Sequence, residues 1–129
     1  MANANLKATF SISSSDLFDT ISLAKTVSNS LTIDGDNRQG LTTMKTSTAY
    51  ADLNVEALSG SSAGLKKAYV YIKNTDSTDE LIIADDGNAI FMRLAPGEFT
   101  FYPSADNTQI QCKSSANNPV VEFMILEVS

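Results

Sequence analysis

The chain has 129 residues, of which 43% are hydrophobic and 19% charged, and its formal net charge is −6. This length suits one domain, and the composition is too apolar for a disordered protein. Nucleic-acid binding needs clustered Lys and Arg, whereas the nine basic residues here are dispersed, so we expect no nucleic-acid partner.

The chain contains no histidine and a single cysteine, Cys112. Ser-His-Asp and Cys-His catalysis are therefore excluded, as is an internal disulfide. One thiol and carboxylates would form a poor set of ligands for a transition metal. We expect Cys112 to be a small, half-buried strand residue, and we expect a protein without catalytic residues, cofactor or metal.

Near the N-terminus, "LKATFSIS" places apolar side chains at every second position, which is typical of a half-buried strand. The first residues lack the basic start and apolar core of a signal peptide, and no apolar run is long enough to span a membrane. We therefore expect synthesis in a cytoplasm, no membrane partner, and one domain over 1–129 with 1–13 as a candidate extended arm.

The middle of the chain is rich in Ser, Thr and turn-forming residues. Residues 17–33 alternate weakly and favour strands because of their β-branched content. "DGDNRQG", residues 34–40, is predicted to be an exposed connection, since Asp, Asn and Gly tolerate tight turns. Residues 41–53 indicate a partly polar or edge strand, and residues 55–58 could hold one helical turn before a loop of small residues.

The C-terminal half has a regular rhythm of short strands. The segments "AYVYIKN", "LIIA", "IFMRL", "FTFYP", "QIQCKS" and "VVEFMILEV" are separated by runs of Asp, Asn, Gly and Pro. Strands that recur about every ten residues with short turns are typical of antiparallel sandwiches and barrels. We predict an all-β fold, an antiparallel β-sandwich resembling a jelly roll.

Pro96 and Gly97 predict a tight turn between two of these strands. Proline fixes φ near the value that the second turn position needs, and glycine accepts the positive φ of the third position in a type II turn. We predict a hairpin tip that fixes the register of its two strands. The inward side chains should then be those of Met92, Leu94, Phe99 and Phe101.

Glu98, directly after this turn, is the candidate for an acid in a catalytic pair of carboxylates. The chain has fifteen acidic residues, so closeness in sequence carries little information about pairing. The alternative, which we favour, is an exposed turn residue that is solvated or paired with Arg93 across the hairpin.

Asp34 and Asp36 stand in "DGDN", which begins like a calcium-binding loop. The helix-loop-helix pattern fails, because Gln39 occupies the glycine position and Lys45 the position of the bidentate glutamate. A looser calcium site from these two aspartates, or from Asp85 and Asp86, remains an alternative to solvated turns.

Five of the aromatic residues on the C-terminal strands could form a platform for sugars or nucleobases. The chain has no tryptophan, and the aromatic residues occupy strand positions, so core and cross-strand packing is favoured. They are Tyr69, Tyr71, Phe99, Phe101 and Tyr102.

From Ala68 onward, about half of the chain resembles small virion structural proteins of tailed bacteriophages, particularly those of marine phages and cyanophages. The resemblance rests on the "YIKN" strand, the "RLAPGEF" turn, the aromatic "FYP" strand end, the "IQCK" strand and the final "ILEV". It implies a non-enzymatic virion part, with a β-sandwich or jelly-roll fold that is commonly trimeric. It offers no catalytic residues to transfer to this chain.

The sequence and the resemblance together predict a structural protein of the virion that decorates or cements the capsid. Its expected partners are the major capsid protein or other virion proteins, and further copies of itself, with a trimer as one option. Within the same class, the alternative is a tail, collar or fibre component. From a different class, the alternative is a carbohydrate-binding sandwich that uses Tyr69, Tyr71 and Tyr102.

Overall fold

The computed structural model describes residues 2–15, 20–53, 67–85, 87–104, 110–116 and 120–128. The chain divides into two compact units, Met1–Ile33 and Asp34–Ser129. The expected single domain over 1–129, with 1–13 as its arm, stays a prediction.

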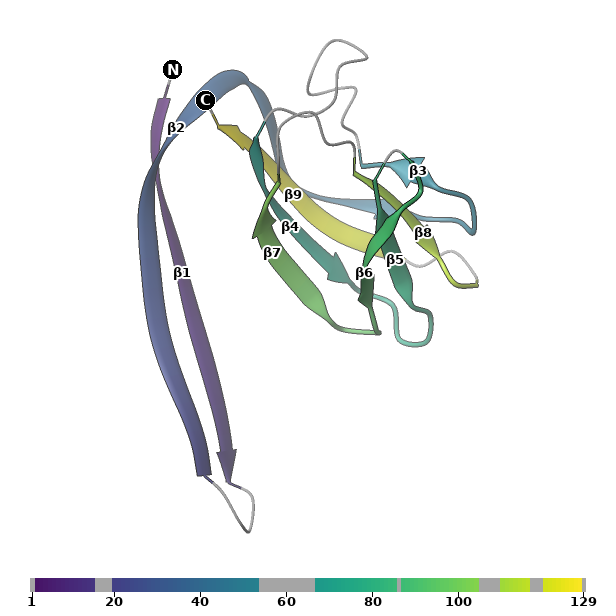
Figure 1. The fold of residues 1–129 in the computed structure, drawn as a ribbon, viewed down its shortest axis with the longest axis horizontal. Coiled ribbons are helices and arrows are strands. Elements are labelled where there is room, and N and C mark those ends of the chain that lie inside the picture. Colours follow the sequence, from purple (N-terminus) through teal and green to yellow (C-terminus); the bar gives the residue numbers. More distant parts are fainter. Residues whose placement is uncertain are drawn as a thin grey trace. The chain divides into compact units, whose positions relative to one another are not determined.

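The first unit is an antiparallel hairpin (Figure 1). Its strand β1 (Ala2–Ser15) pairs with the first part of β2 (Thr20–Lys45) over fourteen residues, from Ala2 opposite Ile33 to Ser15 opposite Thr20. The strand predicted from the alternation of "LKATFSIS" is confirmed as part of β1, and it is longer than the apolar pattern alone indicated.

The second unit is built from two antiparallel sheets. The larger sheet has the strand order β1-β2-β9-β4-β7, in which β1 and part of β2 belong to the hairpin. The smaller sheet has the order β3-β8-β5-β6. The remaining bounds are β3 (Ala51–Asp52), β4 (Ala68–Asn74), β5 (Leu81–Ala84), β6 (Ile90–Leu94), β7 (Phe99–Pro103), β8 (Gln111–Ser114) and β9 (Val120–Val128).

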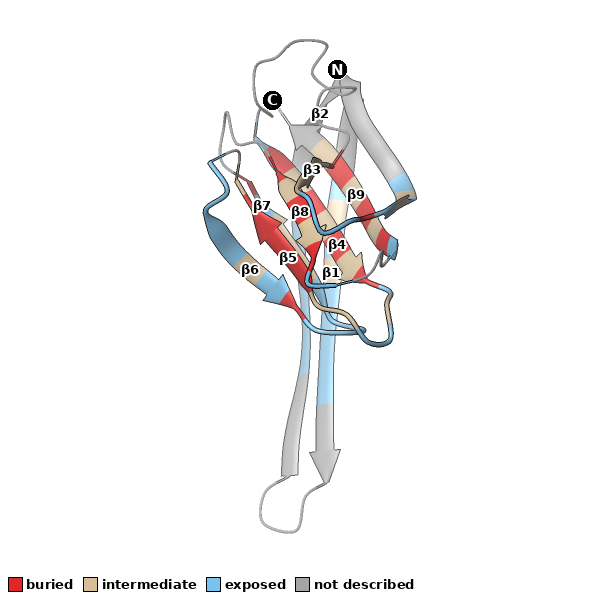
Figure 2. Ribbon diagram, turned by 90° about the vertical axis from the view of Figure 1, so that its right-hand side faces the viewer, coloured by how far each residue is buried: buried red, intermediate tan, exposed pale blue. Residues whose placement is uncertain are grey.

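The hydrophobic core of this unit is formed by inward side chains of both sheets. Val70 and Ile72 of β4 and Phe123 of β9 come from the larger sheet, whereas Ile83 of β5 and Cys112 of β8 come from the smaller one, and all five are fully buried. Figure 2 shows the alternation of buried and partly buried residues along β4 and β9. Because the two sheets share one core, the unit is a β-sandwich.

The all-β class and the antiparallel sandwich predicted from the sequence are confirmed. "AYVYIKN" alternates between buried and half-buried positions as its period predicts. No described residue belongs to a helix, and none therefore forms a helix that could cross a membrane. The helical turn expected at residues 55–58 lies outside the described residues.

The prediction of an exposed connection at residues 34–40 is wrong. The backbone of this segment continues β2, which runs without interruption from Thr20 to Lys45. Strand β2 lies between β1 and β9 in its sheet. The turn preference of Asp, Asn and Gly is a weak local tendency, and the tertiary context of a long strand overrides it in this segment.

The prediction that Pro96-Gly97 forms a hairpin tip is also wrong, although its turn type is right. Strand β6 belongs to the smaller sheet and β7 to the larger one, so the turn carries the chain from one sheet to the other. Instead of pairing with β6, β7 pairs with β4, with Tyr71 opposite Phe101. The turn therefore joins the two layers of the sandwich and sets no hairpin register.

Candidate functional site

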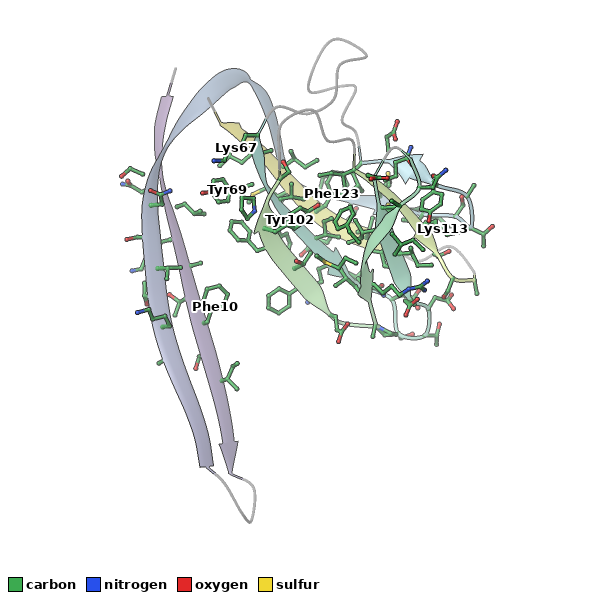
Figure 3. The ribbon with its side chains drawn as sticks, viewed as in Figure 1. Phe10, Lys67, Tyr69, Tyr102, Lys113 and Phe123 are labelled. Atoms are coloured by element: carbon green, nitrogen blue, oxygen red, sulfur yellow. The ribbon has the colours of Figure 1, made fainter. Side chains whose placement is uncertain are left out.

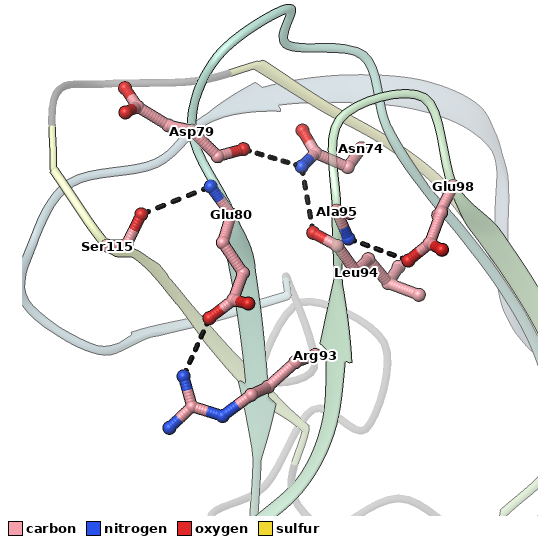
Figure 4. Close-up of polar contacts among 8 residues, drawn as sticks. All are labelled: Asn74, Asp79, Glu80, Arg93, Leu94, Ala95, Glu98 and Ser115. Carbon is pink, nitrogen blue, oxygen red and sulfur yellow. Dashed lines mark hydrogen bonds and ion pairs between the residues drawn. The ribbon is translucent and has the colours of Figure 1, made fainter.

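The turn at Pro96-Gly97 has the geometry of a type II turn. Gly97 has a φ of 81°, and the Glu98 N–H donates to the Ala95 carbonyl oxygen at 3.0 Å. The Glu98 carboxylate accepts a hydrogen bond from the Ala95 N–H at 2.7 Å (Figure 4). The Glu98 side chain thus adds a second hydrogen bond across the turn, to the backbone of Ala95.

The expected pair between Glu98 and Arg93 is not formed. Arg93 donates to the Glu80 carboxylate at 2.6 Å instead, and both side chains are well exposed. Glu80 precedes β5, the hairpin partner of β6, whereas Glu98 precedes a strand of the other sheet. Arg93 pairs with Glu80 and not with Glu98 because the chain passes from the smaller sheet to the larger one between Arg93 and Glu98.

Asn74, at the end of β4, connects the turn to the core. Its side-chain amide donates to the carbonyl oxygens of Asp79 (2.8 Å) and Leu94 (3.0 Å), and its Oδ1 accepts from the Asp76 N–H (3.0 Å). Its backbone binds the turn as well, because the Gly97 N–H donates to the Asn74 carbonyl oxygen. Figure 4 shows this bridge between the sheets, whose role the sequence did not reveal.

Of the four aspartates considered for a calcium site, only Asp85 has a described side chain. Asp85 accepts hydrogen bonds from the N–H groups of Gly87 and Ala89, and so it closes the turn between β5 and β6. Asp86 and the side chains of Asp34 and Asp36 lie outside the described residues. Among described residues, no three His, Cys, Asp or Glu side chains gather closely enough to hold a metal ion.

The outer face of β9, β4 and β7, the side of the larger sheet that faces away from the core, carries apolar and aromatic side chains. Strand pairing places Leu126 beside Tyr69, and Tyr71 between Met124 and Phe101. The next pair along the strands adds Phe99 opposite Lys73. We call this surface the aromatic face and define it by Tyr69, Tyr71, Phe99, Phe101, Met124 and Leu126.

Two contacts order the side chains of the aromatic face. The rings of Tyr69 and Phe101 stack with centroids 5.8 Å apart, as neighbours on adjacent strands do. The Tyr71 hydroxyl donates to the Glu122 carboxylate at 2.9 Å. Partial burial, this hydrogen bond and the charge of Glu122 raise the pKa of Tyr71, so its hydroxyl stays protonated and remains a donor.

The structure separates the aromatic residues that the sequence grouped together. Tyr102 faces the core and packs against it, whereas Phe99 is 63% exposed and Phe101 lies on the outer face. The inward orientation predicted for Phe99 and Phe101 is therefore wrong, and Tyr102 does not join Tyr69 and Tyr71 in a platform. Tyr102, which belongs to β7, is labelled in Figure 3.

Cys112 is more buried than expected, with no exposed surface. Burial raises the pKa of its thiol to about 12, with a smaller contribution from the charge of Asp52. A buried thiol with a high pKa is neither a nucleophile nor a metal ligand at neutral pH. Cys112 is therefore a packing residue of the core.

The aromatic face was not predicted from the sequence. A pattern that indicates it is present in "AYVYIKN" and "EFMILEV", where both the odd-numbered and the even-numbered positions carry apolar or aromatic side chains. Strands that are apolar on both faces bury one face in the sandwich and leave the other available for contacts.

Comparison of this chain with protein-family models, curated proteins and solved structures finds no match.

Proposed function

We propose that this chain is a structural protein of a tailed-phage virion that decorates the capsid and cements it through protein contacts. The observation that carries the proposal is the aromatic face: six apolar or aromatic side chains on the outside of a sandwich that already has a complete core. Such a surface gains free energy by burial against another protein and needs no reactive group.

The order of the strands supports a jelly-roll topology for the sandwich. From β2 onward the chain changes sheet at every connection except the one between β5 and β6. The resulting orders, β2-β9-β4-β7 and β3-β8-β5-β6, are those of two interleaved Greek keys. Viral capsid proteins are among the proteins with this topology, and lectin domains are others.

The mechanism follows from burial at the shell. Apolar area removed from water contributes about 25 cal/mol per Å² before the costs of association are subtracted. A protein that binds the assembled capsid, and not its dissociated subunits, shifts the equilibrium toward the assembled state. The net charge of −6 favours solubility of the unbound protein, while the aromatic face supplies the contact with the shell.

The proposal is tested on particles that lack this chain, to which the purified protein is added back. Particles without it are expected to release DNA at a lower temperature than complete ones, and added protein is expected to restore the difference. Phe99→Ser should abolish both binding and restoration, because Phe99 is the most exposed ring of the aromatic face.

Ile90→Ser is the matched control. Ile90 is also an exposed apolar residue, but it lies on β6 of the smaller sheet. It should bind particles as the unmodified chain does. Equal DNA release with and without the chain would refute cementing, and equal loss of binding in the two variants would refute the assignment of the aromatic face.

The two alternative functions considered in the sequence analysis predict different results with the same particles and purified protein. A tail, collar or fibre component would be labelled by gold-conjugated antibody at one end of the particle, whereas a decoration protein would be labelled evenly over the head. A carbohydrate-binding sandwich would give hits on a glycan array that are lost in Tyr69→Ala.

A further inference from the structure

The hairpin formed by β1 and the first part of β2 has two chemically different faces. In an antiparallel ladder, residues directly opposite each other lie on the same face. One face carries Leu6, Ala8, Phe10 and Ile12 of β1 together with Val27 of β2. Phe10, Ile12 and Val27 are 44%, 55% and 46% exposed. Figure 3 labels Phe10 on β1.

The opposite face is polar. It carries Asn5, Lys7, Thr9 and Ser11 of β1 opposite Ser30, Ser28, Thr26 and Ala24 of β2. The hydroxyls of Thr9 and Thr26 lie 3.3 Å apart, and Ser30 donates to the Asn5 side chain at 3.3 Å. Polar contacts across this face fix the two strands side by side, and they leave the apolar face to be covered by something else.

A two-stranded hairpin is marginally stable in water unless its apolar face is packed. Three exposed side chains of this size on one ribbon would be a liability for a chain made in many copies. The sequence of the face itself indicates which surface covers it.

The apolar face has two polar interruptions, Asn29 opposite Leu6 and Lys25 opposite Phe10. They stand two residues to either side of Val27, and all three belong to β2. A twofold axis through the Ala8–Val27 pair would therefore place Asn29 of one ribbon opposite Lys25 of a second ribbon. It would also place Leu6 opposite Phe10, with the small Ala8 side chains facing each other at the centre.

This pattern is self-complementary, because each polar residue meets a polar residue and each apolar residue an apolar one. The Asn29 side chain can accept a hydrogen bond from the Lys25 ammonium group, so neither group is buried without a partner. An isologous contact of this kind is the commonest way in which identical chains associate.

The distribution of charge also favours a second hairpin as the occupant. In residues 1–33 two lysines balance two aspartates, so the net charge of −6 belongs entirely to residues 34–129. Two hairpins can therefore approach without net repulsion, whereas two copies of the acidic unit cannot.

The area is sufficient for a reversible dimer. A ribbon of fourteen residue pairs is about 45 Å long, and two strands are about 10 Å wide. Two such faces packed together bury on the order of 900 Å² in total, close to the roughly 1,000 Å² expected of a specific interface.

We infer that the apolar face of the hairpin binds the same face of a second copy of this chain, about a twofold axis at the Ala8–Val27 pair. The inference deepens the proposed function and rests on it for its meaning, since it adds a contact between copies to the proposed contact with the shell. In this arrangement the hairpin joins two copies of the chain.

The test uses the full-length purified chain in sedimentation equilibrium over a range of concentrations. A reversible monomer–dimer equilibrium is expected. Val27→Asn should weaken dimerisation at least about tenfold, because the substitution enters the contact twice at its centre. Thr26→Asn is the matched control: it makes a β-branched residue into Asn at the neighbouring position, on the polar face, and should leave the dimer unchanged.

Cross-linking gives a second readout that does not depend on affinity. Val27→Cys is expected to yield a covalent dimer with a short bismaleimide, since packed sheets lie about 10 Å apart and the two introduced thiols face each other. Thr26→Cys should yield little, and the unmodified chain none, because Cys112 is buried.

A chain that stays monomeric at every concentration would overturn the inference, as would a trimer or equal effects of Val27→Asn and Thr26→Asn. Each of these results leaves the proposed function standing. That function is tested on particles and through Phe99, which belongs to the other unit.

Discussion

The side-chain amide of Asn74, at the end of β4, donates a hydrogen bond to the Leu94 carbonyl oxygen, at the end of β6 in the opposite sheet, over 3.0 Å. Asn74 has no exposed surface, and its second donor hydrogen goes to the Asp79 carbonyl oxygen. One buried side chain thus links the two layers of the sandwich at the point where the chain crosses between them.

Asn74→Ala should lower the free energy of unfolding by about 2–4 kcal/mol, because it leaves buried carbonyl oxygens without donors. Asn74→Asp should cost at least as much near neutral pH, since a carboxylate would face the Leu94 and Asp79 oxygens. Urea denaturation measures both variants. A loss below about 0.5 kcal/mol in both, the range of ordinary surface substitutions, would contradict this role of Asn74.

Gly97→Val should destabilise the protein by about 1–2 kcal/mol, because its φ of 81° is unfavourable for a β-branched residue. The space around an added Cβ is open, so the cost lies in the backbone alone. Gly97→Asn should cost less, since Asn tolerates positive φ. Thermal denaturation of both variants separates backbone strain from steric conflict.

Glu98→Ala should cost about 0.5–1 kcal/mol, less than Gly97→Val, because it removes one exposed hydrogen bond to the Ala95 N–H. Arg93→Ala is the control. It breaks the pair with Glu80, which is exposed on both sides, and should change the melting temperature little. Equal melting temperatures for Gly97→Val and Glu98→Ala would refute the type II turn as a source of stability.

The free energy of unfolding should fall at alkaline pH because the thiol of Cys112 is buried. Burial raises the pKa of its thiol to about 12 in the folded state, whereas a thiol in an unfolded chain ionises near about 8.5. Between these values the unfolded state releases a proton that the folded state keeps, so stability falls by about 1.4 kcal/mol per pH unit. Denaturation at pH 7.5 and pH 10 should show a smaller loss in Cys112→Ala, and equal losses would contradict the shift.

Tyr102→Phe should leave stability unchanged or raise it slightly. The Tyr102 hydroxyl is buried, and among the described residues it has no hydrogen-bond partner. Burial raises the pKa of this phenol, and the cost of burying the hydroxyl disappears when phenylalanine replaces it. Tyr71→Phe is the comparison, because it removes the bond to Glu122. A loss above about 1 kcal/mol in Tyr102→Phe would show that the hydroxyl has a partner.

Local patterns predicted the fold class but not the pairing of the strands. The alternation in "AYVYIKN" identified β4 and its buried residues, and Pro96-Gly97 identified a type II turn, because both signals lie within a few residues. β7 pairs with β4 in the larger sheet, and the turn before β7 is bound to the end of β4. The Asn74 carbonyl oxygen accepts a hydrogen bond from the Gly97 N–H, which lies more than twenty positions later in the chain. No local pattern contains that contact.

The orientation of β7 could not be read from its residues either. "FTFYP" offers Phe99 and Phe101 on one face and Tyr102 on the other, so both choices bury an aromatic ring. The neighbouring strand β4 determines which face of β7 is buried. Val70 and Ile72 of β4 are fully buried, and they pair with Tyr102 and Thr100 of β7, so these two residues lie on the inner face. The aromatic face escaped prediction for the same reason, since it exists only once β9, β4 and β7 are side by side.

The passage of the chain between the two sheets has a consequence for the rate at which the sandwich forms. Apart from β5 and β6, strands of the second unit that follow each other in sequence lie in different sheets, so their pairing partners are distant in sequence. Closing long loops costs entropy before any contact compensates for it, and folds of this kind take milliseconds to seconds. The β5–β6 hairpin is the element that can form first, and the crossing at Pro96-Gly97 must wait until β4 is in place to receive it.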